Sequence, residues 1–258
     1  MLYKKNKKIK RAKSTVIGEL LDDDVYDFVL LTVRENQLYE ALTELKNNKS
    51  TTIVTMVNSL DDYKKWEDIV GKGRILPAFP GAGGSMSDGI LDASLTPRVI
   101  QPTTFAAISG NTAERTKQFS KILKYSHIPY QQVKNMHIWQ LCHLAMVVPI
   151  ADAYYEAACP EKTGKEWKVM RKTAERLKRN FCFIKKKFGT LSPLKMNIFR
   201  FLPLSILTIV LSTTFESQFG NKFMYQHAMK APDEMWELLS QPKTIGITPF
   251  IKKEPISH

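Results

Sequence analysis

The pattern of apolar and polar positions is most regular around residues 25–37, which read VYDFVLLTVRENQ. Val25 and residues 28–33 form an apolar, β-branched run that predicts a strand covered on both faces, as in a parallel sheet. Polar residues follow it, and apolar residues then recur at helical spacing from Leu38 to Leu45. A buried strand that leads into a polar turn and a helix is half of a βαβ unit, which predicts an α/β domain.

The same alternation continues as far as residue 133. Further strands are expected over residues 16–21, 51–57, 75–79 and 128–133, and helices over residues 60–70 and 113–125. Residues 97–105 are expected to be extended, because Pro102 would break a helix there. Residues 1–15 are rich in lysine and carry no periodic pattern, so we expect a mobile terminus or the remains of a connection.

The second half of the chain carries helical patterns only. Residues 135–158 are apolar on nearly all sides, as in a helix buried in a domain core. Residues 167–188 carry one apolar stripe at alternating steps of three and four, and shorter helices are expected over 203–215 and 232–239. The pattern therefore predicts two domains, residues 1–133 with a Rossmann-like parallel sheet and residues 134–258 all helical.

Polar residues stand directly after two of the predicted strands. Arg34 and Gln37 follow the first, and Asn58 follows the second. Ligands of open α/β sheets bind at the carboxyl ends of parallel strands, so these three residues are candidates for ligand contact. Residues 80–85, PGAGGS, are a further candidate: their amides could face an anion, although a plain turn between strands is the favoured interpretation.

Composition limits the classes of function. The 258 residues can bury a substantial core, and the three cysteines lie far apart without a CxxC pair, which is typical of reduced thiols in a cytoplasmic protein. The formal net charge is +13, but residues 1–13 and 162–187 hold seven and eleven of the Lys and Arg residues. We interpret the second cluster as a solvated helix face. The alternatives are a phosphate-rich ligand, nucleic acid or an acidic membrane surface. Single-stranded nucleic acid is disfavoured, because aromatic residues do not interleave with the lysines.

Neither a metal site nor a membrane span is expected. His137 and His143 are six residues apart, so they cannot form the i, i+4 pair of a helical zinc site. The longest apolar stretch, residues 201–215, is interrupted by polar residues and is shorter than the roughly 20 residues of a span. His143 lies in an apolar helix and is interpreted as a satisfied core residue, with proton donation beside a ligand as the alternative.

The order of these parts resembles the ketopantoate reductase (2-dehydropantoate 2-reductase) family. The run YDFVLLTVRENQ, a strand ending in MVN, and a helical half that opens with HIWQLCHLA carry the resemblance. It implies a Rossmann-type NADP domain, followed by a helical domain like that at the C terminus of 6-phosphogluconate dehydrogenase. It also implies reduction of a small 2-oxo acid, with Arg34, Gln37 and Asn58 close to cofactor and substrate.

The chain departs from the family at several positions. The family's general-acid lysine, two residues after the tryptophan, is Leu141 here, and its asparagine four residues further on is Ala145. Leucine cannot donate a proton, so His143 becomes the candidate replacement donor. The family's opening strand, GxGxxG turn and helix have no counterpart, and we expect the chain to be the downstream part of a longer protein, with a catalytically degenerate relic as the alternative.

These patterns predict an NADP-dependent oxidoreductase of a small 2-oxo or 2-hydroxy acid, truncated or catalytically altered. The alternative is a non-catalytic ligand-binding or protein-interaction module on the same scaffold. A sheet without its first strands would expose an unpaired edge, through which two copies could form a homodimer.

Overall fold

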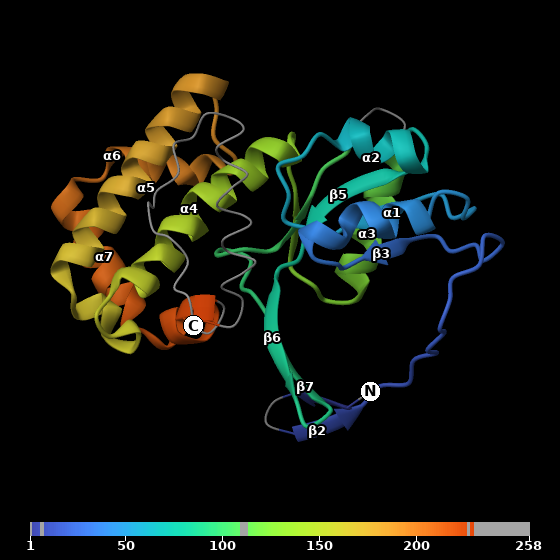
Figure 1. Cartoon of the computed structure of the whole chain (residues 1–258), viewed down its shortest axis with the longest axis horizontal. Helices are drawn as coiled ribbons and strands as arrows, with labels where there is room; N and C mark the ends of the chain where they lie inside the picture. The colour runs from blue at the N-terminus through green and yellow to red at the C-terminus, as the bar shows by residue number, and fades with distance from the viewer. Residues whose placement is uncertain (1, 6–7, 109–112, 226–227, 230–258) are drawn as a thin grey trace. The chain divides into compact units, whose positions relative to one another are not determined.

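The structure of the chain is a computed structural model that describes residues 2–5, 8–108, 113–225 and 228–229. Two compact units divide it, Met1–Met136 and His137–His258. The first is an α/β unit built on a sheet with mostly parallel strand pairs, and the second is helical (Figure 1). The expected fold class is therefore confirmed, while the helix expected over 232–239 lies outside the described residues.

A five-stranded sheet forms the centre of the first unit. Its strands lie in the order β3-β4-β5-β8-β9, and the β5–β8 pair alone is antiparallel. Their bounds are β3 Val29–Leu31, β4 Ile53–Thr55, β5 Ile75–Phe79, β8 Thr103–Phe105 and β9 Tyr130–Gln132. The strand expected over 75–79 is reproduced to the residue, whereas those at 51–57 and 128–133 are shorter than expected.

Helices cover both faces of this sheet. Helices α1 (Leu38–Glu44) and α2 (Tyr63–Val70) pack on one face, and α3 (Ala113–Tyr125) packs on the other (Figure 1). Neighbouring residues of β4 point to opposite faces, so Ile53 joins the cluster around Trp66 and Val54 joins the cluster around Phe105. The β4 strand is thus buried on both sides, as its run of apolar residues predicts.

The prediction that the strand after Asp27 is covered on both faces is wrong. β3 lies at the edge of the sheet, with Leu31 buried and Leu30 53% exposed. Residues 16–21 form no strand either, and Val16 is 88% exposed. Burial of an apolar run depends on its neighbours in the fold, which local periodicity does not specify.

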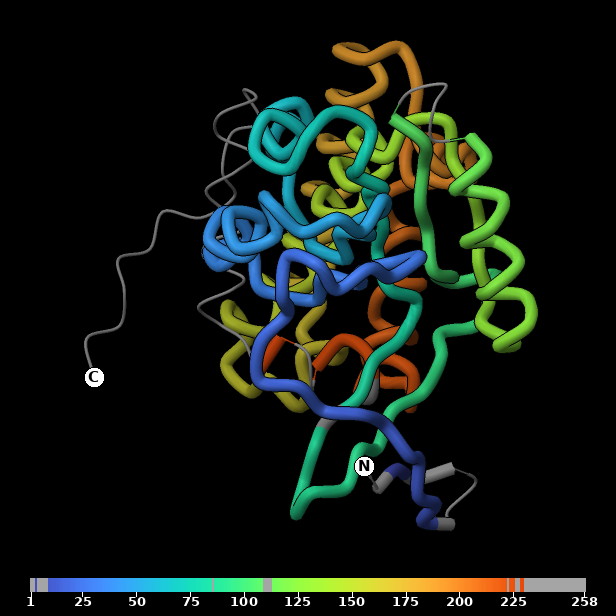
Figure 2. The backbone as a smooth tube through the Cα atoms, turned by 90° about the vertical axis from the view of Figure 1, so that its right-hand side faces the viewer, coloured from blue at the N-terminus to red at the C-terminus, as the bar shows by residue number. Residues whose placement is uncertain are grey.

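A second sheet in the first unit was not expected. Strands β6 (Ala82–Ser87) and β7 (Ile90–Leu95) form an antiparallel hairpin, and the N-terminal β1 (Leu2–Lys5) and β2 (Lys8–Arg11) extend it. Figure 2 shows this hairpin projecting from the body of the unit beside the N-terminal strands. The expected mobile terminus is therefore wrong: β1 finds its partner in β7, more than 80 residues away in sequence.

The second unit consists of α4 (Met136–Glu156), α5 (Trp167–Phe188), α6 (Ile198–Phe201) and α7 (Leu204–Phe215), with short turns between them. The apolar stripe of α5 is buried over most of its length, and Gly189 ends the helix with a left-handed φ of 71°. The short η4 turn (Leu194–Asn197) and α6 were not predicted. Among the described residues no single helix is long and apolar enough to span a membrane. Residues 194–201, which comprise η4 and α6, reach the length and composition of a span only when α7 is added, and the two parts meet at an angle of 117°.

Candidate functional site

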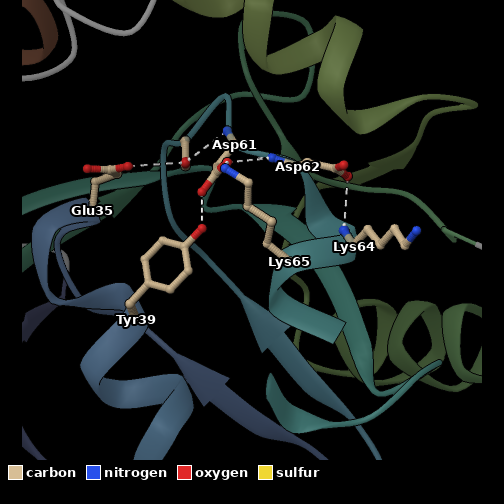
Figure 3. Close-up of polar contacts among 7 residues, drawn as sticks. Glu35, Tyr39, Asp61, Asp62, Lys64 and Lys65 are labelled. Carbon is tan, nitrogen blue, oxygen red and sulfur yellow. Dashed lines mark hydrogen bonds and ion pairs between the residues drawn. The ribbon is translucent and has the colours of Figure 1, made fainter. Parts of the chain in front are cut away.

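The carboxyl edge of the five-stranded sheet brings two of the three predicted ligand contacts together. β3 and β4 pair in parallel, with Leu31 opposite Thr55. Arg34 and Asn58 each lie three residues beyond this pair, so each of the two strands is followed by a polar residue at the same edge of the sheet. The two loops are in direct contact there, because the Ser59 hydroxyl donates to the Glu35 carboxylate at 3.4 Å (Figure 3).

Gln37 has a local structural role. It ends the single 3-10 turn Glu35–Gln37, and its side-chain oxygen accepts a hydrogen bond from the Arg34 amide at 3.3 Å. This bond gives a partner to one of the backbone amides that have none within the helix at its start. The side chain of Arg34 remains exposed at the edge of the sheet, with its backbone held by the turn.

Asn58 carries the clearest sign of a ligand position. The residue is half-buried, yet its side-chain oxygen is inaccessible to solvent and has no hydrogen-bond partner within the described residues. A buried acceptor without a donor costs about 1–3 kcal/mol. A hydrogen-bond donor of a bound molecule at the sheet edge would remove that cost.

A polar network that the sequence did not predict anchors the loop around Asn58. The Tyr39 hydroxyl of α1 donates to the Asp61 carboxylate, and Lys65 of α2 donates to the same carboxylate at 2.9 Å (Figure 3). The Asp61 amide in turn donates to the Ser59 hydroxyl at 3.2 Å. The loop is thereby tied to the helices on either side of it. The sequence signals for this arrangement are the i, i+4 spacing of Asp61 and Lys65 and the position of Asp62, whose side chain caps α2 at the Lys64 amide.

The protonation states of Tyr39 and Asp61 are suited to fixing the loop by hydrogen bonds and not to transferring a proton. Burial and the adjacent Asp61 carboxylate raise the pKa of Tyr39 to about 12. Burial disfavours the ionised form of Asp61, but hydrogen bonds from Tyr39 and Lys65 outweigh it and hold the Asp61 pKa below its usual value. At neutral pH the tyrosine therefore stays a donor and the carboxylate an acceptor.

The glycine-rich stretch 80–85 is neither the plain turn that the sequence favoured nor an anion cradle. Most of it is strand β6, whose residues Gly83 and Gly84 pair with Ser94 and Ala93 of β7. A Cβ atom on Gly84 would lie 2.5 Å from the Asp92 carbonyl oxygen. The Asp88-Gly89 pair in the sequence is a signal for such a hairpin, and both residues take positive φ in the turn. The glycine here allows close strand packing.

In the helical unit, the residue at the position of the family's general acid is Leu141, which lies in the core. Leu141 is fully buried on α4. Two residues further along the helix, the His143 ring stacks on the ring of Trp139, one turn before it, with centroids 5.2 Å apart and planes at 6°. Burial raises the pKa of the neighbouring Cys142 thiol to about 11, which makes it an inert core residue. Whether His143 donates a proton stays a prediction.

A buried ionic cluster links α4 and α5 in the same unit. The Arg176 guanidinium lies 2.6 Å from the Glu156 carboxylate and 3.6 Å from that of Asp152, and Lys172 binds Glu156 at 2.7 Å. Asp152 is 1% exposed, and within the described residues neither of its carboxylate oxygens has a hydrogen-bond partner. Burial raises the pKa of Asp152 to about 7, although Arg176 opposes the shift.

This cluster predicts a pH-dependent stability. An unfolded Asp152 ionises near its usual pKa of 3.8, whereas the folded form keeps its proton up to about pH 7. The folded state therefore binds more protons in this window, and the free energy of unfolding falls as pH rises through it, by roughly 2–4 kcal/mol. Denaturant unfolding of the protein and of Asp152→Asn should show the variant gaining relative stability from pH 4 to 7 and then levelling off. Asp68→Asn, at an exposed site, should give no such difference.

No group of three or more His, Cys, Asp or Glu residues in the described parts of the chain could hold a metal ion.

Comparison with solved structures identifies the fold. A D-mandelate dehydrogenase in complex with NADH matches with a TM-score of 0.60 at 13% identity, over 89% of this chain and 75% of that chain. The ternary complex of D-mandelate dehydrogenase with NADH and anilino(oxo)acetate matches with a TM-score of 0.57 at 14% identity, over 96% and 80%. A dimeric ketopantoate reductase from Staphylococcus aureus gives 0.54 at 13%, over 87% and 78%.

No family model and no curated protein matches the sequence. At the low identities of the structural matches, the likeness establishes the fold: the chain folds like ketopantoate reductases and D-mandelate dehydrogenase, as the sequence resemblance implies.

Proposed function

We propose that this chain is a nicotinamide-dependent oxidoreductase of a small 2-oxo or 2-hydroxy acid. The observation that carries the proposal is the buried, unpartnered side-chain oxygen of Asn58 at the carboxyl edge of the parallel sheet. Ligands of α/β sheets bind at that edge, and a buried acceptor there needs a donor. The fold shared with an NADH-binding dehydrogenase supports a nicotinamide as the source of that donor.

The residues of the sheet edge fit part of such a ligand. The Asn58 oxygen can accept from a carboxamide or hydroxyl group, and the exposed Arg34 guanidinium can bind a carboxylate or phosphate through paired hydrogen bonds. The sequence holds no GxGxxG, and residues 82–87 are a strand, so these residues supply no glycine turn for a pyrophosphate. NADP rather than NAD follows from the family resemblance. A bound nicotinamide would supply hydride chemistry.

One observation favours a second candidate, a non-catalytic ligand-binding module. Leu141 stands at the family's proton-donor position and is fully buried. A ketone that accepts hydride also needs a proton, so an active protein must take it from another group. His143 is the candidate within the described part of α4.

Titration with NADPH and NADH, by calorimetry or nicotinamide fluorescence, tests the proposal on the full chain. We expect binding, and we expect Asn58→Ala to weaken it about tenfold, equivalent to about 1.4 kcal/mol. The same substitution should leave the unliganded protein as stable or more stable, because it removes an unsatisfied acceptor. Asn36→Ala, an exposed asparagine of the adjacent turn, is the matched control and should change neither.

The outcomes separate the two candidates. Cofactor binding with oxidation of NADPH by small 2-oxo acids would support the oxidoreductase. Binding that Asn58→Ala weakens, without turnover of any 2-oxo acid, would support the binding module. The absence of binding at millimolar NADPH and NADH would contradict the nicotinamide assignment.

A further inference from the structure

The segment from η4 to α7 in the helical unit exposes a group of apolar side chains. Six large apolar residues of η4, α6 and α7 are each between 46% and 73% exposed. We call them the α6–α7 surface, and they are Leu194, Ile198, Phe201, Ile206, Ile209 and Val210. Single apolar side chains on a surface are ordinary, whereas a group of this size marks a site of interaction with a protein or a membrane.

In α7 the exposed and the buried apolar residues occupy opposite faces of the helix. Ile206, Ile209 and Val210 share the exposed face, and Leu207 and Leu211 are buried on the other. The helix packs against α5 (Figure 1). The packing of the unit therefore uses only one of the two apolar faces of α7.

The exposed side of α6 is likewise a fixed part of the fold. The Phe199 ring stacks on the Phe181 ring of α5, with centroids 4.9 Å apart and planes at 10°. The Lys178 ammonium group of α5 donates to two carbonyl oxygens at the C-terminal end of α6, at 2.6 and 2.9 Å. These contacts hold α6 on α5 and give partners to carbonyls that have none within a helix. Phe201 remains exposed beyond them.

The charge along this part of the chain has one sign. Residues 177–215 hold seven Lys and Arg residues and no Asp or Glu. Three of the lysines, residues 185–187, lie in the last turn of α5, and Lys195 and Arg200 lie within η4 and α6. The Arg200 guanidinium lies over the Phe201 ring, 5.1 Å from its centroid. Apolar side chains that have only cations as charged neighbours in the sequence are complementary to an anionic surface with an apolar interior.

We propose that the α6–α7 surface docks this protein on the anionic phospholipid surface of a membrane. Its apolar side chains would lie at the boundary between headgroups and acyl chains, and the neighbouring lysines and arginines would contact lipid phosphates. A second copy of the chain fits less well, because two copies of a surface with only positive charge repel each other. Nucleic acid offers negative charge but no apolar phase for leucine and isoleucine side chains. The proposal does not depend on the proposed oxidoreductase activity.

Co-sedimentation of the full chain with phospholipid vesicles tests the proposal. We expect binding to vesicles of phosphatidylcholine and phosphatidylglycerol, weaker binding as the salt concentration rises, and little binding to phosphatidylcholine alone. Phe201→Gln and Ile209→Gln should each weaken binding about tenfold, because each removes apolar area that the membrane would withdraw from water. Ile122→Gln, the same change at an exposed isoleucine of α3, is the matched control and should leave binding unchanged.

A charge variant separates the electrostatic from the apolar contribution. Lys186→Glu, at an exposed lysine in the last turn of α5, should weaken binding at low salt and have little effect at high salt. Binding that is unchanged in both Phe201→Gln and Ile209→Gln would overturn the role of the apolar side chains. Equal binding to both kinds of vesicle, or to neither, would overturn the proposal. If the chain binds no vesicle and forms a dimer that Phe201→Gln dissociates, as measured by light scattering, the partner is a second copy instead.

Discussion

Replacing Arg74 by alanine is expected to lower the free energy of unfolding of the first unit by about 3 kcal/mol. Its guanidinium and Nε donate to five backbone carbonyl oxygens, at distances between 2.5 and 3.4 Å. These carbonyls belong to Leu45, Lys46, Asn48, Ser50 and Val70. One side chain thus ties the ends of α1 and α2 to the segment that leads into β4.

The size of this effect follows from where the carbonyls lie. The last carbonyls of a helix have no partner within the helix, and a cation there satisfies them and also opposes the helix dipole. Hydrogen bonds from a charged donor are worth about 1.5–3 kcal/mol each in favourable cases, but water replaces part of each one after truncation. Burial lowers the pKa of Arg74, and the nearby Arg115 adds to this shift, so part of the gain offsets the cost of burying the charge.

Hydrogen exchange with mass spectrometry would measure the effect within the correct unit. Peptides from β4 and from the ends of α1 and α2 should exchange faster in Arg74→Ala, while peptides from α5 should keep their protection. Arg98→Ala, at an exposed arginine of the same unit, is the matched control and should change stability by less than about 0.5 kcal/mol. A loss as small as that of the control would show that solvent replaces all five bonds.

The sequence predicts those parts of the fold whose pattern is local. The limits of β5, α3 and α5 follow from the apolar pattern alone. Parallel pairing of β3 with β4, which the βαβ pattern implies, is enough to bring Arg34 and Asn58 to one edge. Their role at a ligand stays a prediction.

Other features depend on partners that are distant in sequence. β1 forms a strand because β7 offers it an edge, and no pattern within a run of lysines indicates that partner. The exposure of Leu30 reflects the absence of a neighbouring strand within the described residues, although its apolar surroundings predict burial. The unsatisfied oxygen of Asn58 is likewise a property of the packed loop. The sequence identifies this asparagine as a candidate ligand contact, but it does not show that the side-chain oxygen lacks a hydrogen-bond donor.

The buried cluster between α4 and α5 gives the largest expected effect. Replacing Arg176 by methionine is expected to destabilise the helical unit by about 3–5 kcal/mol at about pH 8. Methionine preserves most of the volume of the arginine stem, so the loss reports the charge rather than a cavity. The substitution leaves the buried Asp152 carboxylate without its cation, while Glu156 retains Lys172 at 2.7 Å.

The dependence of this loss on pH and on a second substitution identifies its origin. Below about pH 7 the Asp152 carboxyl is protonated in the folded state, so the loss in Arg176→Met should shrink as pH falls. At high pH, adding Asp152→Asn to Arg176→Met should recover part of the stability, because no uncompensated charge then remains at that position. Arg171→Met, which removes an exposed pair with Glu175 on the same helix, should cost less than about 1 kcal/mol at every pH. An equal loss at all pH values, without recovery in the double variant, would show that Arg176 stabilises the unit through packing and its pair with Glu156, and not through Asp152.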